Sequence, residues 1–526
     1  MHASRTVKII LRIISVCLVL MAVIVLGCQL MAKKSIANYL DTKLPPHIQL
    51  DYKDIDVNVL MGTAKLHTIK LDIGKRDSVR HTAVQIEALE VVGLGYWHFL
   101  VNNKVQVENL NIETPKFTHY LKEQQTDTAQ EDNDHIALLK TIQIGKIKVS
   151  NGAITLLKRD SDSTAMKLDS VHIEIEDVKT DVELINSKIP VTYASLNFTG
   201  ESLYVDLGAY EVLSIAKVDV NEGNLSVSDL KLKSKYNKTE LSWHLHKEHD
   251  YINLEIPKVH FKAIDFGYKN EKLWVRTGPA KLTGPNLEMY RDKLLPDDWV
   301  RKKLYSKALR ELPIQIEVPE IAIEDGHIVY SERVNRKTEP GKIVFAKVDA
   351  KILNVQNLSD KKEDTQVKAK ALLMNQAPIT LNWSFDVQKE SDAFTASGTV
   401  KNFNSKGLNS FLDSNLRVRA EGEVQELYFT ISGDAKSSVG DMKMKYEDFE
   451  FSVLKKDRSG INKLLTTIGK IFVNDGSNTD ESGYRYGGIT AERDPTKSFF
   501  NYLWLNVSSG LTSTILGNGE NERRKK

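Results

Sequence analysis

The segment Val171-His-Ile-Glu-Ile-Glu-Asp-Val178 alternates apolar residues with polar or charged ones. Successive side chains of a β-strand point to opposite faces, so this alternation predicts a strand with one buried and one solvated face. The same pattern recurs at 63–73, 105–113, 416–423 and 442–453. Continuous apolar runs, which a parallel sheet covered on both faces would show, are scarce. The sequence therefore predicts a mainly β protein with a long, curled, mostly antiparallel sheet and a few short helices.

One ten-residue unit recurs along the chain. It has a central Asn-Gly at 147–156, a central Asp-Gly at 321–330 and a looser Glu-Gly copy at 218–227. Asn-Gly and Asp-Gly favour a two-residue hairpin turn, because both central residues need a positive φ. Pairing around that turn places the apolar residues of each unit on one side. These residues are Ile147, Val149, Ile154 and Leu156; Val218, Val220, Leu225 and Val227; and Ile321, Ile323, Ile328 and Tyr330. The uneven spacing of the copies excludes a strict short-period solenoid.

An apolar segment lies near the N-terminus. Residues 13–32 carry no charge, and about 20 such residues in a helix span a hydrocarbon layer of ~30 Å. Three basic residues precede the segment and two follow it, which favours a cytoplasmic N-terminus. We interpret the segment as a single-pass anchor. Two alternatives are a lipoprotein signal ending at Cys28, after Val25-Leu26-Gly27, and a cleaved signal peptide.

Helical patterns are few. Residues 287–312 show two amphipathic pieces split at Pro296, with Asp297 or Asp298 as the expected cap. Shorter helices are expected at 95–102 and 461–473, and polar loops at 122–135 and 475–488.

The last predicted helix, at 498–516, contains no charged residue. One face of this helix carries Phe500, Leu503, Trp504, Val507 and Leu511. Its many Asn, Ser and Thr residues make it polar for a membrane span. Three interpretations follow: a helix packed on the sheet, a helix that docks on a membrane surface or a partner, and a second span.

Composition narrows the class of function. The 72 Lys and Arg residues nearly balance the 70 Asp and Glu residues, which excludes a polycation that binds nucleic acid. Both cysteines lie in the apolar N-terminal segment, so the rest of the chain has no disulfide or thiolate metal site. Nucleophile-elbow, Walker, zincin and EF-hand motifs are absent. His244, His246 and His249 are the best metal candidates, but a solvated strand end is the favoured interpretation. We expect no catalytic site, no metal and no cofactor.

These patterns suggest five regions. They are a cytoplasmic tail and anchor at 1–34, a β-groove region at 35–286, a helical insertion at 287–312, a second β-groove region with a helix at 313–475, and a loop, amphipathic helix and basic tail at 476–526.

The whole arrangement resembles the AsmA-like envelope proteins of diderm bacteria, which are grouped with the repeating β-groove, or bridge-like, lipid-transfer proteins. The matching stretches are the anchor Ile9–Met31, MGTAKLHTIKLDI from Met61, ALEVVGLGYWHFLVNNKVQVENLNIETPKF from Ala88, the units KVSNGAITL and AIEDGHIVY, and GDMKMKYEDFEFSVL near the C-terminus. The resemblance implies a non-enzymatic protein anchored in the bacterial inner membrane, with most of its chain in the periplasm. It further implies phospholipid or another acyl lipid as the ligand, and outer-membrane components as further partners.

An apolar face of a sheet can be used in two ways. The face can be filled by the protein as a core, or it can line a trough that holds acyl chains. The first use would suit a structural or assembly factor for outer-membrane proteins. The second would suit a protein that binds or conducts phospholipid between the two membranes in outer-membrane biogenesis.

Overall fold

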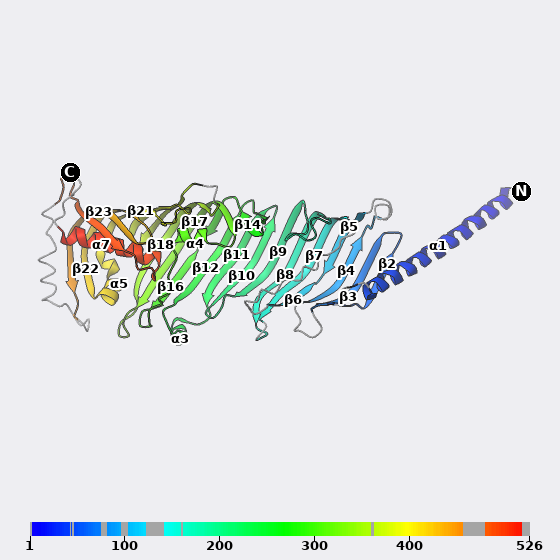
Figure 1. Cartoon of the computed structure of the whole chain (residues 1–526), viewed down its shortest axis with the longest axis horizontal. Coiled ribbons are helices and arrows are strands. Elements are labelled where there is room, and N and C mark those ends of the chain that lie inside the picture. The colour runs from blue at the N-terminus through cyan, green and yellow to red at the C-terminus, as the bar shows by residue number, and fades with distance from the viewer. Residues whose placement is uncertain are drawn as a thin grey trace. The chain divides into compact units, whose positions relative to one another are not determined.

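The computed structural model describes residues 3–42, 44, 47–74, 82–95, 104–121, 141–158, 161–358, 362–455 and 479–517 (Figure 1). The predicted fold class is confirmed, because an N-terminal apolar helix is followed by a long, curled, mostly antiparallel sheet with few short helices. The predicted helix at 461–473, the predicted loop at 122–135 and all but Gly95 of the helix predicted at 95–102 lie outside the described residues.

Helix α1 spans Ala3–Thr42, eight residues beyond the end predicted for the anchor. Within the described chain, the part from Leu20 to Thr42 is the one helix long and apolar enough to cross a membrane, and none of its apolar stretch is buried. An ion pair between Lys33 Nζ and Asp54 Oδ1, 2.8 Å apart, ties the end of α1 to strand β2 (Asp54–Asn58).

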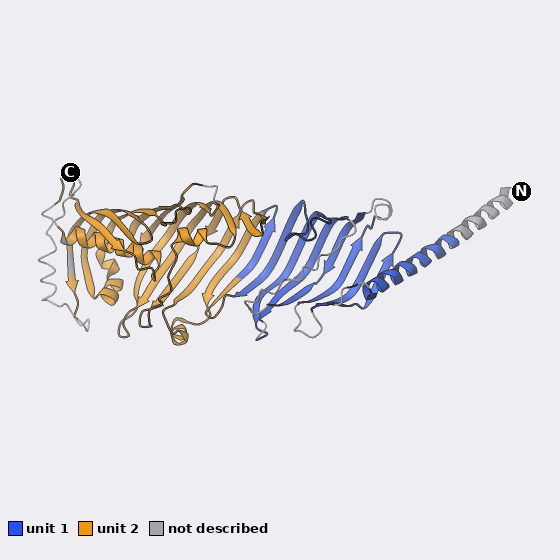
Figure 2. Cartoon of the chain, viewed as in Figure 1, with its two compact units in different colours: residues 1–206, 215–223 blue, residues 207–214, 224–526 orange. Residues whose placement is uncertain are grey.

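The chain divides into two compact units (Figure 2). Unit 1 comprises residues 1–206 and 215–223, and unit 2 comprises residues 207–214 and 224–526. Besides α1 and β2, unit 1 contains β1 (Ile48–Asp51), β3 (Thr63–Ile73), β4 (Thr82–Val92), β5 (Lys104–Glu113), β6 (Lys116–Leu121), β7 (Thr141–Lys158), β8 (Thr164–Thr180) and β9 (Ser195–Asp206). Strand β10 (Glu211–Asn221) contributes residues to both units.

Unit 2 contains the remaining elements. Its strands are β11 (Asn224–Ser234), β12 (Asp250–Phe261), β13 (Asp265–Lys269), β14 (Lys272–Arg276), β15 (Ala280–Thr283), β16 (Asn286–Asp292), β17 (Gln315–Arg333), β18 (Gly341–Gln356), β19 (Thr365–Leu373), β20 (Ala377–Phe385), β21 (Phe394–Asn404), β22 (Val418–Gly433), β23 (Ser437–Val453) and β24 (Arg485–Glu492). Its helices are α3 (Lys238–His244), α4 (Tyr305–Arg310), η1 (Ser405–Leu408), α5 (Asn409–Phe411), the π-helix η2 (Leu412–Leu416) and α7 (Phe499–Leu516).

Both units interrupt the antiparallel order in the same way. In unit 1, β5 and β6 run parallel to β7, and in unit 2, β14, β15 and β16 run parallel to β17. Parallel neighbours need a connection that returns across the sheet. In unit 2 this connection is residues 293–314, which we call the strap.

Two of the three predicted hairpins are wrong. Residues 147–156 lie inside the single strand β7, and residues 321–330 lie inside β17. Asn151 and Asp325 do adopt positive φ values, 54° and 53°, but each forms a β-bulge in a strand that continues. The physical reason is pairing, since both halves of β7 bond to β8 and both halves of β17 bond to β18.

The third copy turns as predicted. Strand β10 ends at Asn221, Glu222 and Gly223 have φ values of 48° and 72°, and β11 begins at Asn224. Two consecutive positive φ values are the signature of the expected turn.

The helical insertion predicted at 287–312 is corrected. Its first piece is strand β16, which pairs with β12 on one side and β17 on the other. Only Tyr305–Arg310 is helical, and its N-cap is Leu304, not Asp297 or Asp298. The loop predicted at 475–488 ends earlier, because β24 begins at Arg485.

Candidate functional site: an open apolar face and a capped end

One face of the sheet in unit 1 carries rows of apolar side chains that run from strand to strand. Leu66, Leu89, Ile112, Val149, Ile173 and Phe198 form one such row, in which each residue is the registered partner of the next. Every side chain in this row is half-buried and none is fully covered. In the described part of unit 1, this face is therefore partly open to solvent.

Unit 2 carries an equivalent row on its first strands. It consists of Leu232, Leu254, Leu287, Ile328, Phe345 and Leu373, again joined pair by pair in the sheet register. These six side chains are also half-buried. Each unit thus has an apolar strip that the described residues of that unit cover only in part.

The residues predicted to line a groove all lie in strands. Eleven of the twelve are half-buried and Val227 is buried. Their predicted partners within hairpins are wrong in the first two units, where Ile147 instead pairs with Leu110 and Ile175. The extra residue of the bulge shifts the alternation by one, so residues on both sides of it return to the same face.

The opposite face of the sheet is charged. Lys146 lies 3.1 Å from Glu176, Lys281 lies 2.7 Å from Glu324, and both pairs join different strands. The hydrogen bond from Lys146 lowers the pKa of the Glu176 carboxyl. These pairs are exposed, so they keep this face in water and add little stability.

The last strands of unit 2 differ, because their apolar face is filled by the protein. A buried cluster joins β20–β24 with Leu304 of the strap and with α7. Its members are Leu304, Ala377, Phe385, Val387, Phe394, Ala396, Phe403, Val424, Leu427, Phe429, Ile431, Met442, Met444, Ile489, Ala491, Phe499, Tyr502 and Ile515. This end of the sheet has an ordinary core.

Helix α7 covers the last strand by hydrogen bonding as well as by packing. Strand β24 pairs with β23, and its N–H groups at Gly488 and Thr490 donate to the hydroxyls of Ser513 and Ser509 at 3.0 and 3.1 Å. A Cβ at Gly510 would lie 2.7 Å from Met442 Cε, so glycine permits this close approach. The polar residues of this uncharged helix therefore satisfy a sheet edge.

The guanidinium of Arg485 holds the C-terminal end of α7 in place. Arg485 is 1% exposed, and it donates from Nε to the carbonyl of Thr514 at 3.1 Å and from Nη2 to that of Gly517 at 2.8 Å. A cation at a helix C-terminus offsets the unpaired carbonyls and the negative end of the helix dipole.

The face of α7 predicted to dock is only partly exposed. Leu503, Val507 and Leu511 are half-buried against the core cluster, while Phe500 and Trp504 are 57% and 36% exposed. The fully buried residues are Tyr502, Asn506, Gly510 and Thr514, together with Phe499 and Ile515 near the two ends of the helix. The four-residue spacing from Tyr502 to Thr514 could have indicated a buried helix face, but the polar residues among these four do not resemble a core.

The strap is fastened near both of its ends. Near its start, Glu248 N–H donates to the Pro296 carbonyl at 2.8 Å, and Lys497 Nζ lies 2.5 Å from Asp297 Oδ1. Near its end, Ser306 and Arg310 both donate to Asp392 at 2.9 Å. Hydrogen bonds from Lys247 and Lys302 hold the pKa of the neighbouring Asp298 carboxyl far below its usual range. The strap thus lies fixed over the packed end of unit 2.

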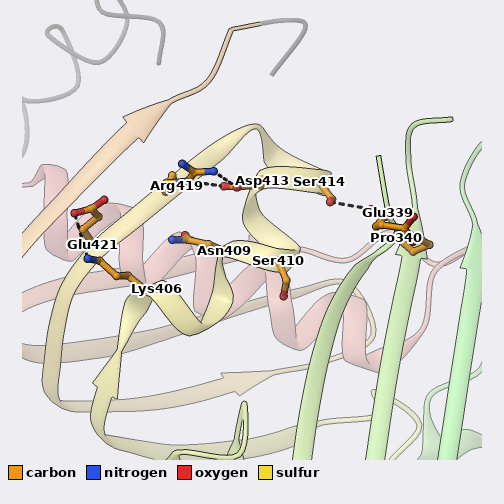
Figure 3. Close-up of a pocket in the computed structure, with 9 residues that line it drawn as sticks. All are labelled: Glu339, Pro340, Lys406, Asn409, Ser410, Asp413, Ser414, Arg419 and Glu421. Atoms are coloured by element: carbon orange, nitrogen blue, oxygen red, sulfur yellow. Dashed lines mark hydrogen bonds and ion pairs between the residues drawn. The ribbon is translucent and has the colours of Figure 1, made fainter. Parts of the chain in front are cut away.

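A polar cavity of about 530 Å³ lies beside η2 (Figure 3). Its charged side chains face one another as the pairs Arg419 with Asp413 and Lys406 with Glu421. Its remaining lining residues are Glu339, Pro340, Asn409, Ser410 and Ser414. Four of the five charged lining residues compensate one another in these pairs, and Glu339 leaves the lining with a net charge of only −1.

The histidines of the candidate metal motif point to different partners. His244 ends helix α3, not a strand, and stacks on Tyr236 with ring centroids 4.0 Å apart. His249 Nε2 lies 2.5 Å from Glu211 Oε1. Over the part of the chain that the structure describes, no three His, Cys, Asp or Glu residues are grouped as a metal site.

No protein-family model matches this chain, and no curated protein matches it.

Proposed function

We propose that this chain is a non-enzymatic, AsmA-like carrier that binds or conducts phospholipids along the open apolar face of its sheet. In this proposal, α1 anchors it in a bacterial inner membrane and the two units lie in the periplasm, where lipid passes toward the outer membrane. The observation that carries the proposal is the pair of half-buried apolar rows, one in each unit.

Acyl chains are the occupants that this face suits. Removing one CH2 group from water contributes about 0.8 kcal/mol, so a chain lying along the rows gains with every carbon. The surface is uniform from strand to strand, so it offers binding without demanding one fixed position. A phospholipid head group would remain in water beyond the strand ends.

A second candidate function is a structural or assembly factor for outer-membrane proteins. The packed core of β20–β24 favours it, because this part of the apolar face has no room for a ligand. The two functions differ in what they predict for the open rows. A carrier must bind lipid there, whereas an assembly factor need not.

The experiment uses the full chain purified in a mild detergent. We expect mass spectrometry to find co-purified phospholipid, and vesicle assays to show lipid exchange between membranes. Ile173→Glu places a charge in the unit 1 row and should reduce both signals about tenfold or more. His172→Glu is the matched control, since His172 is the neighbouring residue on β8 and is exposed.

The absence of bound lipid and of exchange in the unmodified protein would refute the carrier. Equal losses in the Ile173 and His172 variants would show that the apolar face is not the binding surface. Capture of assembly proteins with no lipid would favour the second candidate function.

A further inference from the structure

Exposed aromatic side chains gather where the strap meets the beginning of α7. Trp299 is 76% exposed, and Val300, Tyr305, Phe500 and Trp504 are also exposed. We call these five residues the aromatic surface. It belongs entirely to unit 2 and lies outside the open apolar rows.

The contacts between strap and helix hold these residues together. Lys302 N–H donates to the Pro495 carbonyl at 2.7 Å, just before α7 begins. The rings of Tyr305 and Phe500 lie with centroids 6.4 Å apart, and Phe500 and Trp504 are one helical turn apart on α7. Leu304 anchors the strap in the core beneath them. The surface is therefore built on a rigid base.

The strap is basic. Residues 293–314 contain six Lys or Arg residues and three Asp or Glu residues, a net charge of +3. Asp297 and Asp298 pair with Lys497 and Lys247 from outside the strap. Lys293 and Arg310 pair with Glu248 and Asp392, also from outside it, so these partners leave the net charge unchanged. Arg301 stands exposed between Val300 and Lys302. Helix α7 has no charged residue to oppose an anionic partner.

We propose that the aromatic surface docks unit 2 on an anionic phospholipid bilayer. Trp and Tyr favour the boundary between water and hydrocarbon, and basic side chains near an anionic leaflet each contribute about 1 kcal/mol. Trp299 and Phe500 enter the head-group region, while the exposed Arg301 contacts lipid phosphates. The neighbouring Lys302 and Lys303 are held by Asp298 and Glu311 and add to the positive potential at a distance. This docking would give the chain a second membrane contact beside α1, which rests on the anchoring stated under the proposed function.

The test uses the full chain with α1 held in nanodiscs of phosphatidylcholine. Vesicles of phosphatidylcholine, with or without phosphatidylglycerol, are added, and the nanodiscs that float with the vesicles are measured. We expect the nanodiscs to float with the anionic vesicles, and added salt should weaken this flotation. Little flotation is expected with the neutral vesicles. Trp299→Ser combined with Phe500→Ser should weaken anionic flotation about tenfold.

Trp243→Ser is the matched control, because Trp243 is 77% exposed on α3, outside the aromatic surface. It should leave flotation unchanged. Equal weakening by the Trp243 variant, or no flotation of the unmodified chain, would overturn the docking surface. A photoreactive residue at 299 that labels protein but no lipid in intact membranes would also overturn it.

The same variants separate docking from lipid carrying. Ile173→Glu should leave flotation intact, and the Trp299 and Phe500 variant should keep its co-purified lipid. The docking inference can therefore fail while the carrier proposal stands, and the reverse is equally true.

Discussion

Arg485 is a charged residue placed where charge is rarely found. It is almost fully buried, and two carbonyls at the end of α7 accept its hydrogen bonds. A buried cation needs such partners, because leaving one of them unpaired costs several kcal/mol. Arg485 is the first residue of β24, and its side chain thus links this strand to the last turn of the helix that covers it.

Replacing Arg485 should release the end of α7. Arg485→Ala removes two charge-assisted hydrogen bonds, one of them to the buried carbonyl of Thr514, so we expect a loss of about 3 kcal/mol in the free energy of unfolding of unit 2. Urea unfolding monitored by hydrogen exchange of α7 measures this loss. Arg336→Ala, at an exposed arginine, should change it by less than about 0.5 kcal/mol. Similar values for both variants would contradict the assigned role.

At the scale of elements, the bulges in β7 and β17 are built alike. A Cβ at Gly152 would lie 3.4 Å from Pro115, and a Cβ at Gly326 would lie 3.4 Å from Pro285. In both places the neighbouring strand breaks at that proline, and the carbonyl of the proline accepts the N–H of the residue after the glycine at 2.8 Å. The two units therefore bend their parallel strand pair with the same device.

Asn151 tests whether the bulge depends on its left-handed residue. A β-branched side chain at a φ of 54° is strained, so Asn151→Val should lower the unfolding free energy of unit 1 by about 1–2 kcal/mol. Asn151→Gly should be neutral or slightly stabilising, because glycine adopts this conformation freely. Thermal or urea unfolding followed by circular dichroism compares the two. The prediction fails if valine is tolerated as well as glycine.

The bulges also show how far local sequence reaches. Alternation at positions such as Val171 to Ile175 correctly predicted strands, because the period of two is a property of each strand alone. The Asn-Gly and Asp-Gly pairs specified only a left-handed residue, which a turn and a bulge both accept. Distant pairing with β8 and β18 decided between them. Residues 287–292 became a strand for the same reason, since β12 and β17 flank them.

Helix α7 illustrates the corresponding limit for the candidate site. Its apolar face could be read from the spacing of Phe500, Leu503 and Val507. The part that the polar residues play in covering the sheet could not, because Ser509 and Ser513 accept hydrogen bonds from the backbone of a strand that the helix sequence does not contain. The sequence of the strap likewise could not reveal its position, since that position follows from the parallel pairing of β16 with β17.

At the scale of the whole molecule, one apolar face serves two purposes. Along the first strands of each unit its side chains remain half-buried, whereas β20–β24 fill theirs with the strap and α7. The proposed carrier therefore has a working length shorter than the sheet. Lipid would have to enter and leave before the packed end.

Photocrosslinking can measure this working length. A photoreactive amino acid at Ile173, in the open row, should label phospholipid in intact cells, whereas one at Val400, packed against the core, should label only the protein itself. Lys148, exposed beside the open row on β7, should label neither. Lipid adducts at Val400 would show that the packed end opens, and would extend the path through it.

The cover that α7 provides for β24 has a consequence for crowded membranes. An uncovered final strand would be a template on which the first strand of another copy could continue the ladder. Because the N–H groups of Gly488 and Thr490 already donate to serine hydroxyls of the same molecule, they cannot pair with another strand. If α1 anchors the protein as proposed, this cover would hinder copies in one bilayer from polymerising tail to head into filaments.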